Sequence, residues 1–353
     1  MVIKKIISGF IPIITLFFIV SCNQDQPVSL GAGPIPGLDS SSQYLVYYGD
    51  WNEQQIRYSE AFDLIILHPQ SNLSPEIVTD LKDGIDNLPG TDDDVVVVAY
   101  ISLGEELPGD PIKGDGKGPV TWKDSSLVYK HQGVAGYYID ANDDDEVDLN
   151  GTWGSTYVNA GDPNWFIHLQ TRKMGLNYIM ETLGCDGIFM DTIDSASPWH
   201  VYAWMLEGMS DLIKNIREAY PSSIMVANRG LFYFYDSIPK MDQYNIRSYV
   251  NAVMFEAYYT GWNWEKSVGE INPWFAENHK GEAVPHVNRE AKKPDGFTVI
   301  CLDYLNPTQE DYQEMLENQI REVGEQTGWI NCITDVLLKS GRNQLYDLAN
   351  SVE

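Results

Sequence analysis

Two acidic residues lie at or near the ends of apolar, strand-like runs, where burial of an unpaired carboxylate is unfavourable. Asp191 closes Gly187–Asp191 (GIFMD), and Glu256 lies in residues 253–257 (VMFEA) between apolar neighbours. A carboxylate at the end of a buried strand is costly unless it is paired or takes part in chemistry. A structural ion pair, for example with Arg229, is the alternative role for either acid. Because several independent acids end such runs, we favour the chemical role.

Two carboxylates across one cleft can cleave a glycosidic bond. One is held protonated and gives its proton to the leaving oxygen, while the other stays ionised to meet the positive charge developing on the sugar. Apolar surroundings raise a carboxyl pKa. We therefore expect Glu256 to be the protonated acid/base and Asp191 the nucleophile or charge stabiliser. A short Asp and a longer Glu, two strands apart around a narrow bore, should come close enough for direct attack, so we predict retention of configuration.

The elements around these acids alternate short β-rich runs with amphipathic segments, the pattern of parallel β/α units. Most runs are apolar without clean alternation, as in strands that pack on both faces. We predict a (β/α)8 TIM barrel. A doubly wound open sheet is the alternative, but no Gly-rich phosphate loop follows the first run. The predicted strands are residues 44–49, 63–68, 95–102, 187–191, 223–228, 252–258, 298–304 and 328–334.

Further polar and aromatic residues stand at or just after the carboxyl ends of these strands. In a β/α barrel those ends line the active site. We predict that the following residues bind substrate: Tyr48, His68, Glu105, Asp194, Asn228, Arg229, Tyr258, Asp303 and Tyr304. Flat aromatic faces suit sugar rings, and one or two of Trp199, Tyr258, Tyr259, Trp262 and Trp264 should serve as platforms.

One connection is too long for a standard crossover. Only its last part, from Asp162, has a helical pattern, and residues 105–161 are rich in Gly, Pro, Asp and aromatics. Loops of this length in compact domains are usually functional. Because the insertion leaves the carboxyl end of strand three, we expect it to form a wall or lid over the catalytic face.

Within this insertion, Asp140, Asn142 and Asp144 place oxygen ligands at alternate positions, as at the start of a calcium loop. The central glycine and closing glutamate of an EF-hand are absent. A solvated acidic loop is therefore favoured over a calcium site, and we expect no metal and no cofactor.

The first 21 residues have the features of a secretory signal peptide. Lys4 and Lys5 precede a short apolar run that ends at Ser21-Cys22, and residues 19–22 (IVSC) resemble a bacterial lipobox. We expect cleavage before Cys22, a lipid on its thiol, and a flexible Pro-, Gly- and Ser-rich tether over residues 22–42. Residues 43–353 would then form the catalytic domain. We expect an exported monomer held at the bacterial envelope, at the outer membrane or cell surface.

The charge of the chain excludes a nucleic-acid partner. The sequence has 23 basic and 51 acidic residues, a net charge of −28. Removing residues 1–21 takes away two lysines and no acid, which leaves 21 − 51 = −30. A surface of that charge repels polyanions. Outside the signal peptide and Cys22, three cysteines remain, and we expect them to be buried free thiols.

Four segments, in order along the chain, resemble the strand motifs of glycoside hydrolase family 114 and its relatives. They are residues 99–105 (AYISLGE), 186–191 (DGIFMD), 226–230 (VANRG) and 253–256 (VMFE), and the resemblance runs from about Tyr44 to Asp335. It implies a β/α barrel whose catalytic acids follow strands four and six, at Asp191 and Glu256. The family contains endo-α-1,4-polygalactosaminidases and hydrolases of amino-sugar exopolysaccharides, so the implied substrate is an α-linked, galactosamine-containing polysaccharide. The acidic segment after Gly109 departs from the family pattern. A barrel that binds glycan without cutting it is the competing hypothesis.

Overall fold

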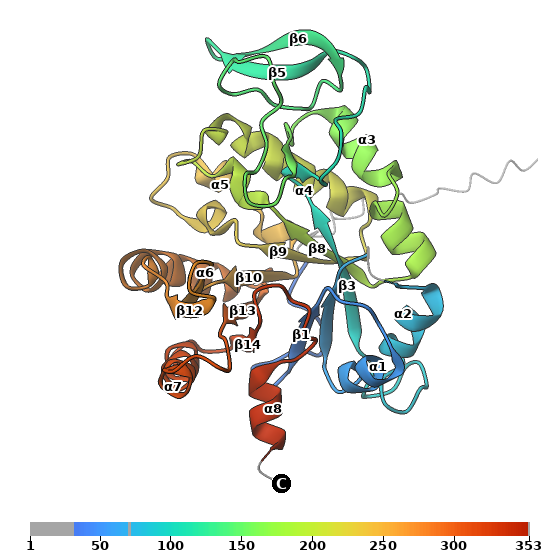
Figure 1. The fold of residues 1–353 in the computed structure, drawn as a ribbon, viewed down its shortest axis with the longest axis vertical. Helices are drawn as coiled ribbons and strands as arrows, with labels where there is room; N and C mark the ends of the chain where they lie inside the picture. The colour runs from blue at the N-terminus through green and yellow to red at the C-terminus, as the bar shows by residue number, and fades with distance from the viewer. Residues whose placement is uncertain (1–31, 70–71, 352–353) are drawn as a thin grey trace, which may run out of the picture. The chain divides into compact units, whose positions relative to one another are not determined.

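Eight parallel strands form one sheet in the order β1-β2-β3-β8-β9-β10-β13-β14, each strand pairing with its neighbours in register (Figure 1). The computed structural model describes residues 32–69 and 72–351. The first and last strands lie beside each other, and the Tyr48 N–H donates to the Leu338 carbonyl beyond β14 at 2.7 Å. The sheet is therefore a nearly closed (β/α)8 barrel, as predicted, and each predicted strand is present.

The barrel strands are β1 (Tyr44–Tyr47), β2 (Leu64–Leu67), β3 (Val96–Ser102), β8 (Gly187–Asp191), β9 (Ile224–Asn228), β10 (Ala252–Glu256), β13 (Thr298–Tyr304) and β14 (Ile330–Thr334). The α-helices are α1 (Glu53–Ser59), α2 (Pro75–Lys82), α3 (Pro163–Thr171), α4 (Leu206–Ala219), α5 (Met241–Tyr244), α6 (Val284–Ala291), α7 (Tyr312–Gly324) and α8 (Gln344–Asn350). Short 3₁₀ or π segments are η1 (Tyr178–Leu183), η2 (Ile193–Ala196), η3 (Ala203–Met205), η4 (Leu231–Phe234), η5 (Arg247–Tyr249) and η6 (Phe275–Ala283). The Ser74 and Asp162 side chains cap α2 and α3 ahead of a proline.

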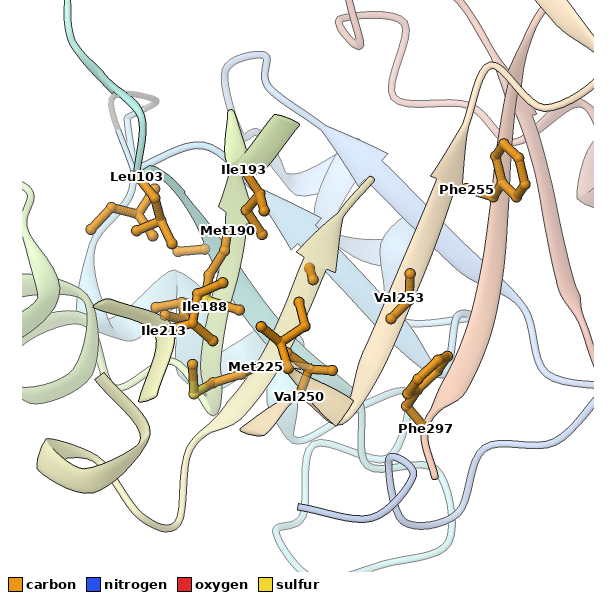
Figure 2. Packing of buried hydrophobic residues seen from close by; sticks show 14 of the residues in the cluster. Leu103, Ile188, Met190, Ile193, Ile213, Met225, Val250, Val253, Phe255 and Phe297 are labelled. Atoms are coloured by element: carbon orange, nitrogen blue, oxygen red, sulfur yellow. The ribbon is translucent and has the colours of Figure 1, made fainter. Parts of the chain in front are cut away.

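Alternate residues of each barrel strand pack on opposite sides, which gives the protein two cores. Val46, Phe189 and Met254 belong to the inner cluster that fills the bore. Their neighbours in sequence belong to the outer cluster between strands and helices. Figure 2 shows part of this outer layer, where Ile188 of β8 lies near Ile213 of α4. Because every strand is apolar on both faces, a polar residue at a strand end stands out from its surroundings.

Part of the predicted tether belongs to the folded barrel. Ile35 is only 1 % exposed, joins the inner core, and donates its N–H to the Thr298 hydroxyl at 3.1 Å. Asn251 donates through Nδ2 to the carbonyls of Ala32 and Gly33, both at 3.1 Å. Thr298 begins β13 and Asn251 precedes β10, so this segment closes the amino-terminal end of the bore. The described residues from Ala32 on thus belong to the barrel, whereas the catalytic domain was predicted to begin at residue 43. The signal peptide and Cys22 lie outside the described residues.

The long insertion folds as two small antiparallel sheets. Strand β4 (Glu105–Glu106) pairs with β7 (Thr156–Tyr157). This pairing brings the two ends of the insertion together near the end of β3. Between them, β5 (Gly118–Lys123) and β6 (Ser126–Val134) form a hairpin. Its Trp122 stacks on Trp204 ahead of α4, with ring centroids 5.2 Å apart, and Figure 1 shows the hairpin beyond α3 and α4.

A lysine lies among the carboxylates of the acidic loop, for which a solvated loop was favoured over a calcium site. The Lys130 ammonium contacts Asp143, lies 3.1 Å from Asp145 and 3.7 Å from Asp140. Asp140 accepts the N–H groups of Asp144 and Asp145 at 3.1 and 3.0 Å, while Asn142 donates to the Asp144 carboxylate at 2.8 Å. Over residues 32–69 and 72–351, no group of three or more His, Cys, Asp and Glu could hold a metal ion.

The three cysteines of the described residues, Cys185, Cys301 and Cys332, are free and buried, as predicted. Within the residues that the structure describes, no helix combines the length and the apolar character needed to cross a membrane.

Candidate active site

Three adjacent strands, β8, β9 and β10, end in Asp191, Asn228 and Glu256. The Asn228 amide nitrogen Nδ2 donates to Asp191 Oδ1 at 2.8 Å and to Glu256 Oε2 at 2.7 Å. Since both bonds share Nδ2, the two accepting oxygens lie no further apart than the two bond lengths end to end, about 5.5 Å. The two acids therefore lie on the same rim, within reach of one glycosidic bond.

Both acids face a cavity of about 710 Å³ at the carboxyl end of the bore. Phe189 and Met254, two residues before each acid on its strand, line the same cavity, as the alternation of strand side chains predicts. Residues 105–108 and 150–155 of the insertion contribute Glu105, Pro108, Asn150, Trp153 and Ser155 to the wall. The ends of the insertion thus form a wall of the cavity, whereas the β5–β6 hairpin does not contribute lining residues.

The residue after each of these three strand ends has left-handed backbone geometry. The φ angles are 59° at Thr192, 55° at Arg229 and 54° at Ala257, none of them glycine. This conformation costs an L-residue about 1–2 kcal/mol. Local bonds hold it: the Arg229 N–H donates to the Met254 carbonyl at 3.0 Å, and the Thr192 hydroxyl accepts the Gly104 N–H at 2.7 Å. Such strained positions cluster at functional sites, and here they flank the carboxylates.

Glu256 is surrounded by groups that favour its ionised form. The Tyr304 hydroxyl donates to Oε1 at 2.6 Å, and Arg229 Nε lies 3.6 Å from Oε2. Burial alone would raise the pKa of Glu256. The Arg229 charge and the hydrogen bonds from Tyr304 and Asn228 outweigh burial and hold that pKa below its ordinary value.

Asp191 has the opposite shift. Burial, followed by the nearby Glu256 charge, raises the pKa of Asp191 to about 6, against the opposing hydrogen bond from Asn228. When the pair holds a single proton, that proton therefore lies on Asp191. The prediction that Glu256 has the raised pKa is wrong. It rested on the apolar residues beside Glu256 in sequence, but the groups that contact its carboxylate are distant or follow another strand. They are Asn228 at the end of β9, Arg229 just after it and Tyr304 of β13.

Most of the other predicted site residues line the cavity. They are Tyr48, His68, Glu105, Asp194, Asn228, Arg229 and Tyr304. His68 stacks on Tyr100 with ring centroids 4.9 Å apart, and burial lowers its pKa to about 4, so the ring is neutral near pH 7. The Glu105 carboxylate accepts hydrogen bonds from Asn150 Nδ2 at 3.0 Å and from the Ser155 hydroxyl, which ties the insertion to the end of β3. Arg229 also reaches Asp194, at 3.4 Å.

Asp303 and Tyr258 were predicted to bind substrate, but neither lines the cavity. Asp303 faces the helix layer, where it accepts the N–H groups of Tyr259 and Thr260 at 2.9 Å and the Gln319 amide at 2.8 Å. The Tyr258 ring packs on Phe255 and Trp329. Asp303 precedes Tyr304 on a strand whose faces alternate, so only one of the two can face the bore. The β10 strand ends at Glu256, before Tyr258.

Several lining residues were not predicted. Tyr100 stands two residues before Ser102 on β3, so strand alternation alone could have identified it. Trp153 and Asn150 come from the insertion, and Lys339 comes from the loop after β14. Neither segment has a periodic pattern that would indicate which way its side chains point. Of the five aromatic candidates, Trp262 and Trp264 line the cavity, whereas Trp199, Tyr258 and Tyr259 do not.

Comparison with known proteins identifies relatives at the level of structure only. No family model matches the chain, and no curated protein matches it. The glycoside hydrolase domain of PelA from Pseudomonas aeruginosa superposes with a TM-score of 0.56 at 18 % identity, covering 84 % of this chain and 96 % of that one. Aspergillus fumigatus Ega3, solved in complex with galactosamine, superposes with a TM-score of 0.52 at 12 % identity, covering 87 % and 96 %. At these identities the likeness establishes a shared β/α-barrel fold.

Proposed function

We propose that this chain is a glycoside hydrolase that cleaves α-linked, galactosamine-containing polysaccharide with Asp191 and Glu256. The observation that carries the proposal is the bridge from Asn228 Nδ2 to both carboxylates at the open end of the bore. Two further findings support it. One similar structure is a glycoside hydrolase domain, and the other was solved with galactosamine. The substrate class also agrees with the family 114 resemblance of the strand motifs.

The separation of the acids favours retention. Retaining enzymes hold their carboxyl groups about 5–5.5 Å apart, whereas inverting enzymes leave about 6.5–9.5 Å for a water molecule. The Asn228 bridge holds the two accepting oxygens no more than about 5.5 Å apart, which is below the separation that inverting enzymes leave for water. In this mechanism one carboxylate attacks the sugar carbon while the other acid protonates the departing oxygen. Water then cleaves the glycosyl ester with the same acid acting as base.

The charge state of the pair favours Glu256 as the attacking carboxylate and Asp191 as the acid/base. Glu256 is kept ionised by Arg229 and Tyr304, and a pKa of about 6 lets Asp191 give and take a proton near neutral pH. This reverses the assignment made from the sequence. The reversal concerns roles alone, because either assignment uses the same pair and the same geometry.

Digestion of partly deacetylated α-1,4-galactosamine polymer, followed by NMR of the first-formed reducing ends, tests activity and stereochemistry together. We expect wild-type cleavage with the substrate's anomeric configuration retained, and loss of cleavage in Glu256→Gln and Asp191→Asn. Glu310→Gln, an exposed acid outside the cavity, is the matched control. A first product of opposite configuration would overturn retention. Polymer binding without cleavage by the wild type would instead favour the non-catalytic barrel.

Azide rescue assigns the two roles. In the alanine variant of the nucleophile, azide attacks the sugar directly and gives a glycosyl azide of inverted configuration. In the alanine variant of the acid/base, azide replaces water on the glycosyl ester and gives a retained product. We expect inversion from Glu256→Ala and retention from Asp191→Ala, and the reverse pattern would restore the sequence-based assignment.

We also propose, from the sequence, that the protein is a monomer anchored by a lipid on Cys22 at the bacterial envelope. Incorporation of an alkyne-labelled fatty acid that is lost in Cys22→Ser would support the anchor. Unchanged labelling in that variant would refute it.

A further inference from the structure

Two tryptophans at the mouth of the cavity are unusually exposed for their size. Trp153 is 57 % exposed and Trp264 is 52 % exposed, and both line the cavity that holds the carboxylate pair. Their rings meet edge to face, with centroids 6.0 Å apart and planes at 77°. They come from separate parts of the chain, Trp153 from the insertion and Trp264 from the turn between β11 (Thr260–Asn263) and β12 (Val268–Ile271).

Both rings are held on turns that asparagine side chains fix. Asn150 Oδ1 accepts the N–H groups of Thr152 and Trp153, and its Nδ2 donates to Glu105 at 3.0 Å. Asn263 Oδ1 accepts the N–H groups of Glu265 and Lys266, both at 3.0 Å. Asx turns of this kind order a loop locally. The two indoles are thus presented to the cavity on ordered backbone rather than tucked into the core.

We propose that Trp153 and Trp264 form a saccharide subsite, outside the bond being cleaved, that stacks the C–H face of a pyranose ring of a polysaccharide. This inference rests on the proposed function and deepens it. An indole offers a flat apolar face and a polar N–H edge, and a pyranose offers the matching C–H face with hydroxyls around its edge. Ligand cavities gain most of their affinity from such apolar walls, with a few polar groups for orientation.

The location of the pair indicates what the subsite selects. The carboxylates, Asn228 and Tyr304 lie at the ends of barrel strands, whereas both tryptophans lie on excursions outside the barrel. A sugar bound by the tryptophans therefore belongs to a chain that extends beyond the cleaved linkage. The subsite should favour long chains over short ones and contribute to KM rather than to the chemical step.

The test compares kcat/KM on long α-1,4-galactosamine polymer with kcat/KM on a short oligosaccharide of the same sugar. We expect the polymer-to-oligosaccharide ratio to fall about tenfold in Trp153→Ala and in Trp264→Ala, a factor typical of one lost stacking contact. Most of the change should appear in KM. Trp153→Phe, which keeps an aromatic face, should recover part of the ratio. Trp274→Ala is the matched control, because Trp274 is 61 % exposed but does not line the cavity.

An unchanged ratio, or an equal loss on polymer and oligosaccharide, would overturn the subsite. A binding experiment separates its failure from failure of the proposed function. Retardation of the Glu256→Gln protein by galactosamine polymer in affinity electrophoresis should weaken when Trp153→Ala is added. If the wild type cleaves nothing but this retardation still depends on Trp153, the hydrolase proposal fails and the subsite stands. Retardation that does not depend on Trp153 refutes the subsite.

Discussion

Replacing Asn228 with alanine removes an amide that donates to both carboxylates. Its two hydrogen bonds, 2.8 Å to Asp191 and 2.7 Å to Glu256, run from the same amide nitrogen. A hydrogen bond to a charged group contributes about 1.5–3 kcal/mol. If the transition state gains this much more from the Asn228 donor than the free enzyme does, Asn228→Ala should lower kcat/KM by about 10- to 100-fold, since about 1.4 kcal/mol corresponds to tenfold.

The pH profile of Asn228→Ala carries the more specific signature. Hydrogen bonds from Asn228 lower the pKa of both carboxyls in the wild type. Without them both pKa values rise, so the acid limb, where Glu256 gains a proton, and the alkaline limb, where Asp191 loses one, should both move to higher pH. Reducing-end release from galactosamine polymer, measured across the acid and neutral range, gives both limbs.

Asn228→Asp sharpens this test. It keeps the size of the side chain but replaces the donor with a third carboxylate beside the pair. At neutral pH it should be less active than Asn228→Ala, because the added charge opposes ionisation of Glu256. Two outcomes would show that the Asn228 hydrogen bonds do not set the charge state of the pair. One is a pH–activity profile of Asn228→Ala whose limbs do not move, and the other is an Asn228→Asp protein as active as wild type.

Three further outcomes follow from other parts of the fold. Ile35→Ala should lower the free energy of unfolding by about 2–5 kcal/mol, as for other large buried side chains, with the loss read from urea titration; an unchanged midpoint would contradict its place in the inner core. Burial raises the pKa of Asp303 to about 6, so ionisation of this carboxyl destabilises the folded state. The contribution of Asp303 to the free energy of unfolding should therefore rise as pH falls from 6 towards 4. Asp303→Asn should lose that pH dependence, up to about 3 kcal/mol, and a variant with the wild-type dependence would assign it elsewhere. Because Lys130 occupies the acidic loop, neither calcium nor a chelator should change Tm, and a calcium-dependent rise would restore the metal hypothesis.

The barrel could be predicted from the sequence because its strands are defined locally. Runs such as Gly187–Asp191 are apolar on both faces, and a polar residue at the end of such a run marks the rim. The same information identified Asp191, Asn228 and Glu256, whose positions follow from strand ends alone.

The electrostatics of the site could not be predicted in the same way. The pKa of Glu256 depends on Tyr304, which lies 48 residues away in sequence, and on the side-chain direction of Arg229. Asp303 and Tyr304 are neighbours in sequence, and choosing between them required the exact strand register. Trp153 belongs to an insertion without periodicity, so its direction is set by tertiary contacts such as the Asn150–Glu105 hydrogen bond.

The segment that closes the amino-terminal end of the bore also limits the routes by which a polymer could reach the carboxylates. Ala32 hydrogen-bonds beneath β10, whereas the carboxylates open at the other end of the same strands. The inner core fills the bore between these two ends. A polymer acted on as proposed would therefore have to enter and leave at the mouth lined by Trp153 and Trp264, and could not thread through the barrel.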